Sequence, residues 1–138
     1  MKKYLIILAI LNVVLFTQCK QESEIEPKQM ELYDLDAIKG RWRHSYEENE
    51  NAYSVYRPSN YKKFPPSRFR QYFDFKDNNL CFFWVLASDD GHYEEEGVWT
   101  YDESTNTITI MMETVPIYKF IILELKEDIL KLKMMSVR

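Results

Sequence analysis

The stretch RFRQYFDFKDNNLCFFWVLASDDGHYEEEGVWTY, residues 68–101, decides the fold because it contains three strand patterns in a row. Arg68–Lys76 alternates between two faces, Leu80–Ala87 is apolar on both faces, and Tyr93–Tyr101 completes the series. The two links between them, DNN and SDDG, consist of residues that favour tight turns. Strand patterns joined by such turns predict antiparallel β-hairpins.

The rest of the chain continues this pattern. Further strands are expected at Thr107–Met112, Ile117–Leu125 and Ile129–Met135, and Gly40–Tyr46 predicts one more before the long segment that follows it. Only Asp36–Lys39 resembles a helical turn. We therefore predict an all-β protein, an antiparallel up-and-down meander that closes into a barrel of about eight strands. A barrel of that size holds packed side chains or one small ligand.

Two Gly-x-Trp triplets lie in these strands, at residues 40–42 and 97–99. Together with the opening LDAIKGRWRHS and the segments GVWTYDESTNTITI and YKFIILELKEDILKLK, they resemble the small lipocalin-like domains of bacterial lipoproteins. The resemblance implies that Trp42 lies across the closed end of the barrel, where a glycine permits a tight approach. Gly40, Trp42, Gly97 and Trp99 are therefore the expected barrel-closing residues.

The N-terminal stretch MKKYLIILAILNVVLFTQC has the layout of a secretory signal, with two lysines, an apolar core and Cys19 at the expected cleavage point. The apolar core is shorter than the roughly 20 residues that span a membrane. We therefore expect a lipoprotein signal peptide over residues 1–18 and a lipidated Cys19 that begins a polar tether over residues 19–34. The barrel is expected over residues 35–138. Ordinary secretion with an unmodified Cys19 is the alternative.

The tether begins with KQESEIE, which resembles the acidic stretch by which some Gram-negative bacteria direct lipoproteins to the cell surface. The expected location is the bacterial cell envelope, with the protein held in the outer membrane by its lipid and, where that resemblance holds, exposed at the surface. A disulfide between Cys19 and Cys81 would exclude lipidation. Cys81 lies in the apolar segment CFFWVLA, however, which favours a buried and inert thiol.

Composition limits the size of the domain and its partners. The chain has 138 residues and a net charge of −4, and loss of the signal removes two lysines and no acid. The mature chain is therefore more acidic, which argues against nucleic acid as its main partner. About 100 residues remain for the barrel, enough for one modest core. The sequence does not decide the oligomeric state.

The segment SVYRPSNYKKFPPSRFR, residues 54–70, is basic and aromatic and contains no acid. In the domains that this chain resembles, the link between the first two strands is a lid over the open end, and this segment is expected to be that lid. Arginine forks bind carboxylate or phosphate, and flat rings stack on apolar faces. The candidate ligand-binding residues are Arg57, Tyr61, Phe64, Arg68 and the strand residue Trp84. The alternative is a solvated loop whose rings cap the barrel.

The sequence contains no pattern typical of a catalytic or metal site. His44 and His92 are the only histidines, and each is expected in a strand or turn rather than as a base. The acidic segment DDGHYEEE, residues 89–96, has good hairpin-turn chemistry and no recognisable metal-ligand spacing. We therefore expect no enzymatic activity, no metal and no cofactor.

These observations predict a cell-envelope lipoprotein whose barrel binds a small apolar or amphipathic ligand under the basic segment. The alternative is a surface interaction module, whose filled barrel is a scaffold for binding a protein or a glycan. Occupancy of the barrel separates the two. A cavity lined by Trp84 and its neighbours favours ligand binding, and a packed interior favours the scaffold.

Overall fold

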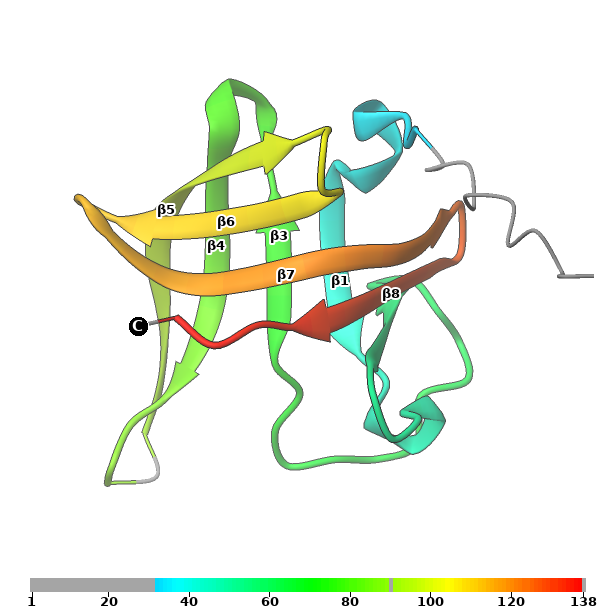
Figure 1. The fold of residues 1–138 in the computed structure, drawn as a ribbon. Coiled ribbons are helices and arrows are strands. Elements are labelled where there is room, and N and C mark those ends of the chain that lie inside the picture. Colours follow the sequence, from blue (N-terminus) through cyan, green and yellow to red (C-terminus); the bar gives the residue numbers. More distant parts are fainter. Residues whose placement is uncertain (1–31, 90, 138) are drawn as a thin grey trace, which may run out of the picture.

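The computed structural model describes residues 32–89 and 91–137 of the chain. Within these ranges, eight strands form one closed antiparallel barrel in the order β1-β2-β8-β7-β6-β5-β4-β3 (Figure 1). The predicted all-β antiparallel barrel of about eight strands is therefore confirmed, and β3 to β8 follow the predicted meander order, whereas the connection from β2 to β3 departs from it. The predicted signal peptide and Cys19 lie outside the described residues, as does most of the tether. Across the part of the chain that the structure describes, no helix is long and apolar enough to cross a membrane.

The strands differ from the predicted ones mainly at their ends. They are β1 (Gly40–His44), β2 (Ser54–Pro58), β3 (Tyr72–Phe75), β4 (Leu80–Leu86), β5 (His92–Asp102), β6 (Thr107–Met112), β7 (Val115–Lys126) and β8 (Ile129–Met134). Three short 3-10 turns accompany them: η2 (Leu35–Ile38), η3 (Tyr46–Glu48) and η4 (Asp77–Asn79). The sequence pattern did not predict β2 as a strand.

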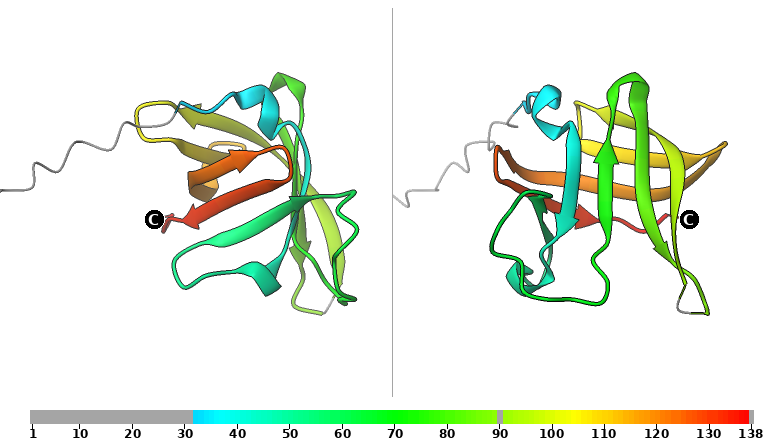
Figure 2. Two further views of the ribbon diagram at one scale, coloured as in Figure 1. Left: turned by 90° about the vertical axis from the view of Figure 1, so that its right-hand side faces the viewer. Right: turned by 180° about the vertical axis from the view of Figure 1, so that it is seen from behind.

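One end of the barrel is closed around Trp42. The turn η2 lies just before β1 at this end (Figure 2), and the Trp42 Nε1 donates a hydrogen bond of 2.7 Å to the carbonyl oxygen of Ile38. Gly40, between these two residues, has a φ of +116°, a conformation that side chains other than glycine rarely adopt. Trp99 packs edge-on against Phe75, with their ring centroids 5.4 Å apart.

Gly97 has a different position from the other predicted closing residues. It lies within β5, facing the interior, where the backbone of β6 approaches closely. A Cβ atom at Gly97 would lie 2.8 Å from the carbonyl oxygen of Met111 and 3.3 Å from the Phe83 ring. Glycine is therefore required here by close packing rather than by backbone conformation.

Side chains from all eight strands fill the interior on the side of Trp42. Phe73 is central, because its ring contacts those of Tyr56, Phe75, Phe83, Tyr118 and Phe120 at centroid distances between 5.1 and 6.4 Å. The aliphatic residues of the same buried cluster are Ile38, Ile108, Ile110, Ile122, Leu130 and Leu132. Burial of this apolar surface is the main favourable contribution to the stability of the barrel.

The basic segment is not a lid between the first two strands. Because β1 pairs antiparallel with both β2 and β3, those two strands run in the same direction. Residues 59–71 therefore connect the end of β2 to the start of β3 on the outside of the barrel, passing the C-terminal end of β1 (Figure 2), and we call them the crossover segment. The predicted lid is wrong for this physical reason: Ser54–Pro58 is a strand, and residues 45–53, which include η3, form the link between β1 and β2.

Candidate functional site

The open end of the barrel lies opposite Trp42. Antiparallel pairing brings together at this end the last residues of β4, the first of β5, the β6–β7 turn and the end of β8. A cavity of about 340 Å³ is present here, and we call it the mouth cup. Its lining residues are Phe83, Val85, Tyr93, Glu95, Met112, Ile117 and Tyr118. All except Glu95 are aromatic or aliphatic.

The floor of the mouth cup is the top of the aromatic core. The Tyr118 ring packs against Phe73 and Phe83 at centroid distances of 5.1 and 5.5 Å. Its hydroxyl accepts a hydrogen bond of 3.1 Å from the Gln71 side chain, and burial raises its pKa above the ordinary value. The mouth cup is therefore a shallow cavity with a rigid, neutral floor rather than a deep hollow barrel.

Glu95 is the one charged group that lines the mouth cup. It alternates along β5 with Gly97 and Trp99, which also face the interior, and it lies opposite Phe83 on β4. Glu95 is half-buried and forms no ion pair with a residue in the described ranges. Its carboxylate gives an otherwise apolar cavity a single strong acceptor.

The rim around the mouth cup is apolar as well. Large hydrophobic side chains at the strand ends there are about half-exposed: Leu86, Tyr93, Val115 and Met134. Exposed apolar residues that gather at one place often mark a binding surface. An apolar molecule that approaches this end of the barrel therefore meets a compatible surface before it reaches the cavity.

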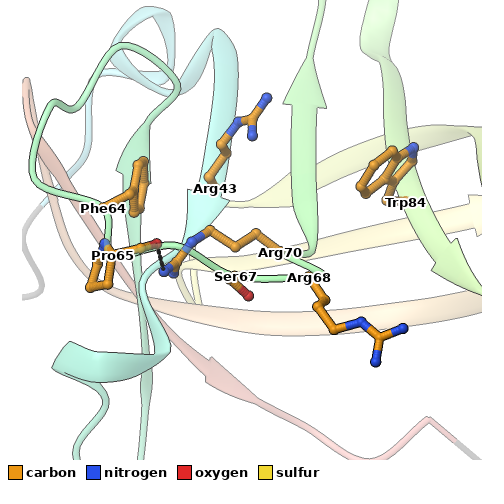
Figure 3. A pocket seen from close by; sticks show the side chains of 7 residues that line it. All are labelled: Arg43, Phe64, Pro65, Ser67, Arg68, Arg70 and Trp84. Atoms are coloured by element: carbon orange, nitrogen blue, oxygen red, sulfur yellow. Dashed lines mark hydrogen bonds between the residues drawn. The ribbon is translucent and has the colours of Figure 1, made fainter.

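Three of the five predicted ligand-binding residues come together, but on the outside of the barrel. Phe64, Arg68 and Trp84 line a second cavity of about 330 Å³, which we call the outer pocket (Figure 3). Its other lining residues are Arg43, Pro65, Ser67 and Arg70. Trp84 faces outward because its neighbours Phe83 and Val85 face the interior, and side chains alternate along a strand.

A family model described as a lipocalin-like domain matches residues 38–132, from the end of η2 into β8. The chain belongs to the lipocalin-like domain family. The matched range contains both the mouth cup and the outer pocket, and it confirms the family that the Gly-x-Trp segments indicated. No curated protein and no solved structure matched the chain.

Arg57 and Tyr61 do not line either cavity of this lipocalin-like barrel. Arg57 donates hydrogen bonds of 2.6 and 2.9 Å to the two carboxylate oxygens of Glu48. It also donates to the carbonyl oxygen of Asp128 at 2.8 Å, and its guanidinium lies 5.0 Å from the centre of the Tyr61 ring. Arg57 thus joins the β1–β2 link to the β7–β8 turn, and its proximity lowers the pKa of Glu48 to about 2.

An aromatic cluster adjoins the outer pocket of the lipocalin-like barrel. Trp84 stacks on Phe69 and His92 at centroid distances of 5.9 and 5.5 Å, and it also contacts Tyr72. The Tyr72 hydroxyl donates a hydrogen bond to Glu94, and the guanidinium of Arg41 lies 4.2 Å from the centre of the Tyr72 ring. These contacts fix the indole of Trp84 at the edge of the pocket.

Glu95 and Arg43 were not among the predicted site residues. The sequence could have indicated Glu95, because side chains alternate along a strand and Glu95 therefore shares a face with Gly97 and Trp99. The sequence could not have indicated Arg43, because the crossover segment covers it only in the folded barrel. No group of three metal-ligating side chains occurs within residues 32–89 and 91–137. Cys81 is a free thiol inside the barrel, and burial raises its pKa to about 12.

Proposed function

We propose that the mouth cup of this lipocalin-like barrel binds a small apolar or amphipathic ligand. The observation that carries the proposal is an apolar cavity of about 340 Å³ at the open end of a barrel whose other end is packed and closed. Ligand sites are typically concave, mostly apolar and roughly 300–1,000 Å³ in volume. The mouth cup lies at the lower end of that range, which favours a compact ligand over a long lipid.

The chemistry of the lining favours one kind of head group. Glu95 is an acceptor in apolar surroundings, so a ligand with an amine or hydroxyl group satisfies it. A second carboxylate beside it would be repelled, because like charges interact strongly where water is scarce. We therefore expect neutral or cationic amphipaths to bind better than fatty acid anions.

A titration with N-phenyl-1-naphthylamine, a fluorescent apolar amine, tests this function. We expect saturable binding to the mature wild-type chain. Val85→Trp places an indole in the mouth cup and should weaken binding by roughly tenfold or more, about 1.4 kcal/mol. Val98→Trp, on the outer face of β5 and away from the cup and its rim, adds the same indole and is the matched control. Absence of saturable binding to wild type overturns the proposal.

A surface interaction module without enzymatic activity is the second candidate. The packed interior beneath Tyr118 and the exposed apolar residues of the rim favour it. In this case the barrel is a scaffold, and a protein or glycan contacts the rim. A wild-type chain that fails to bind the probe but stays folded would leave this candidate as the better explanation.

We further propose that the chain is an outer-membrane lipoprotein anchored through Cys19. The layout of its first nineteen residues supports this. Cys81 has no exposed surface, so a disulfide to it would require the partner sulfur to enter the packed core. Intact mass analysis of the membrane fraction should show a lipid-modified N-terminal cysteine, and Cys19→Ser should abolish that mass. An unmodified mature mass in the wild type would contradict the anchor.

A further inference from the structure

The five arginines that the structure describes fall into two groups. Three of them pair with carboxylates: Arg41 with Asp74 at 2.9 Å, Arg57 with Glu48 at 2.6 Å, and Arg70 with Glu47 at 2.9 Å. Arg43 and Arg68 form no ion pair with any residue in the described ranges. Both of these unpaired arginines line the outer pocket.

Arg43 is the more unusual of the two. It lies on β1 under the crossover segment and is half-buried, and its Nε atom has neither contact with solvent nor a hydrogen-bond partner in the described structure. A buried donor without a partner costs about 1–3 kcal/mol, and more when it is charged. In Figure 3 the Arg43 side chain lies near Phe64, and Trp84 stands on the other side of β3. A ligand that accepts from this guanidinium would recover part of that cost.

The walls of the outer pocket are held in place by contacts of their own. Arg70 donates hydrogen bonds of 2.9 Å to the carbonyl oxygens of His44 and Pro65, and so joins β1 to the crossover segment (Figure 3). Its guanidinium lies 4.8 Å from the centre of the Phe64 ring. The charge of Arg70 is already balanced by Glu47, which leaves Arg43 as the available cation inside the pocket.

We propose that the outer pocket binds a small carboxylate carried on a ring. Arg43 binds the carboxylate, because a guanidinium fork matches its two oxygens, and the ring occupies the space between Phe64 and Trp84, which line opposite sides of the pocket. The cavity of about 330 Å³ suits a single ring. Arg68 is exposed and directed away from Phe64 in Figure 3, so it contributes positive potential at the rim rather than direct binding.

This second site is separate from the mouth cup. Phe83 and Val85 line the cup inside β4, whereas Trp84 lines the outer pocket on the other face of the same strand. The two sites share no lining residue. Val85→Trp should therefore leave the outer pocket unaffected, and failure of one proposal does not decide the other.

Nitrogen-15 NMR of the arginine Nε–H and tryptophan indole signals tests the proposal. The mature chain is titrated separately with benzoate, glucuronate and inorganic phosphate. Benzoate represents an aromatic acid, glucuronate an acidic sugar, and phosphate an anion without a ring. We expect saturable shifts of the Arg43 and Trp84 signals with at least one carboxylate, and weaker binding of phosphate. The carboxylate that binds more tightly shows whether the pocket prefers an aromatic acid or an acidic sugar.

Variants distinguish a specific binding site from nonspecific electrostatic attraction of anions to the protein. Arg43→Gln should raise the dissociation constant of the better carboxylate roughly tenfold or more, and Arg68→Gln by about threefold. Lys62→Gln is the matched control, because it removes one positive charge from the same segment outside the pocket, and we expect less than a twofold change. Trp84→Leu keeps both arginines and should weaken the carboxylate without weakening phosphate.

Three results would overturn the proposal. The first is the absence of saturable shifts with both carboxylates. The second is equal weakening by Arg43→Gln and Lys62→Gln, which would mean that only overall charge attracts the ligand. The third is phosphate binding as tight as that of the better carboxylate, which would mean that the ring makes no contribution. Thermal unfolding of each variant checks that it is folded. Differences in dissociation constant can then be attributed to the pocket rather than to loss of the barrel.

Discussion

The indole nitrogen of Trp42 and the carbonyl oxygen of Ile38 are joined by a hydrogen bond of 2.7 Å at the closed end of the barrel. Both residues are almost fully buried. The bond links η2 to the first strand and satisfies a carbonyl group that water does not reach. It explains how a short 3-10 turn is held across the end of this lipocalin-like barrel.

Replacement of Trp42 by phenylalanine should destabilise the barrel by about 1–3 kcal/mol, because the Ile38 carbonyl group loses its partner inside the core. Trp99→Phe is the matched control, since it removes the same ring volume. The Trp99 Nε1 lies 3.4 Å from the carbonyl oxygen of Lys76, a longer and weaker bond. Urea unfolding should therefore rank Trp42→Phe as the more damaging change, and the reverse order would contradict this assignment.

Gly97→Ala should also destabilise the barrel, by about 1–3 kcal/mol, because the added methyl group meets backbone and ring atoms that cannot move freely. The nearest is the carbonyl oxygen of Met111 at 2.8 Å. Gly91→Ala provides a contrast, since its Cβ would meet the exposed Asp89 side chain, also at 2.8 Å, and that side chain can rotate away. Thermal unfolding should show a clear loss for Gly97→Ala and little change for Gly91→Ala.

Most of the strands could be predicted because alternation and turn residues are local signals. Thr107–Met112 has the predicted bounds, and the neighbouring hairpins differ by one or two residues at most ends. The segment Ser54–Pro58 was not predicted as a strand because its last two residues, Arg57 and Pro58, interrupt the apolar pattern. Its pairing with β1 and β8 is a long-range feature that the sequence does not show.

The site was predictable only in part for the same reason. Trp84 was expected to line a cavity inside the barrel and instead faces outward. The basic and aromatic composition of residues 54–70 indicated Phe64 and Arg68, and both line the outer pocket. Their location outside the barrel depends on the parallel relation of β2 and β3, which places the crossover segment over Arg43. The same topology removes Arg57 from the pocket and pairs it with Glu48.

Stability should fall in acid because paired carboxylates have lowered pKa values. The guanidinium of Arg57 lowers the pKa of Glu48, and Lys126 and Lys131 lower that of Glu124, each from 4.5 to about 2. A carboxylate with a lower pKa in the folded state stabilises the fold above its unfolded pKa, and this contribution is lost as pH falls through the folded pKa. We therefore expect the urea midpoint to be steady above pH 5 and to decline between about pH 4.5 and pH 2.

Glutamine variants identify the groups responsible. Glu48→Gln and Glu124→Gln should each lower stability modestly at pH 7 and reduce the decline in acid, because the titrating group is gone. Both side chains are partly exposed, so solvent screening limits the size of each effect. Glu127→Gln is a control, because no ion pair of Glu127 is present among the described residues. An unchanged acid profile in both test variants would contradict the assignment.

Glu95 should determine which head group the mouth cup accepts. Octylamine and octanoate have similar chains and opposite charges at pH 7, and their competition against N-phenyl-1-naphthylamine measures the preference. We expect octylamine to bind the wild type roughly tenfold more tightly, because Glu95 attracts its ammonium group and repels a carboxylate. Glu95→Gln should reduce this preference to about threefold or less, whereas Glu94→Gln, on the outer face beside Arg41, should leave it intact. Equal binding of the two amphipaths by the wild type would show that Glu95 does not contact the ligand, and would place the head group on the rim instead.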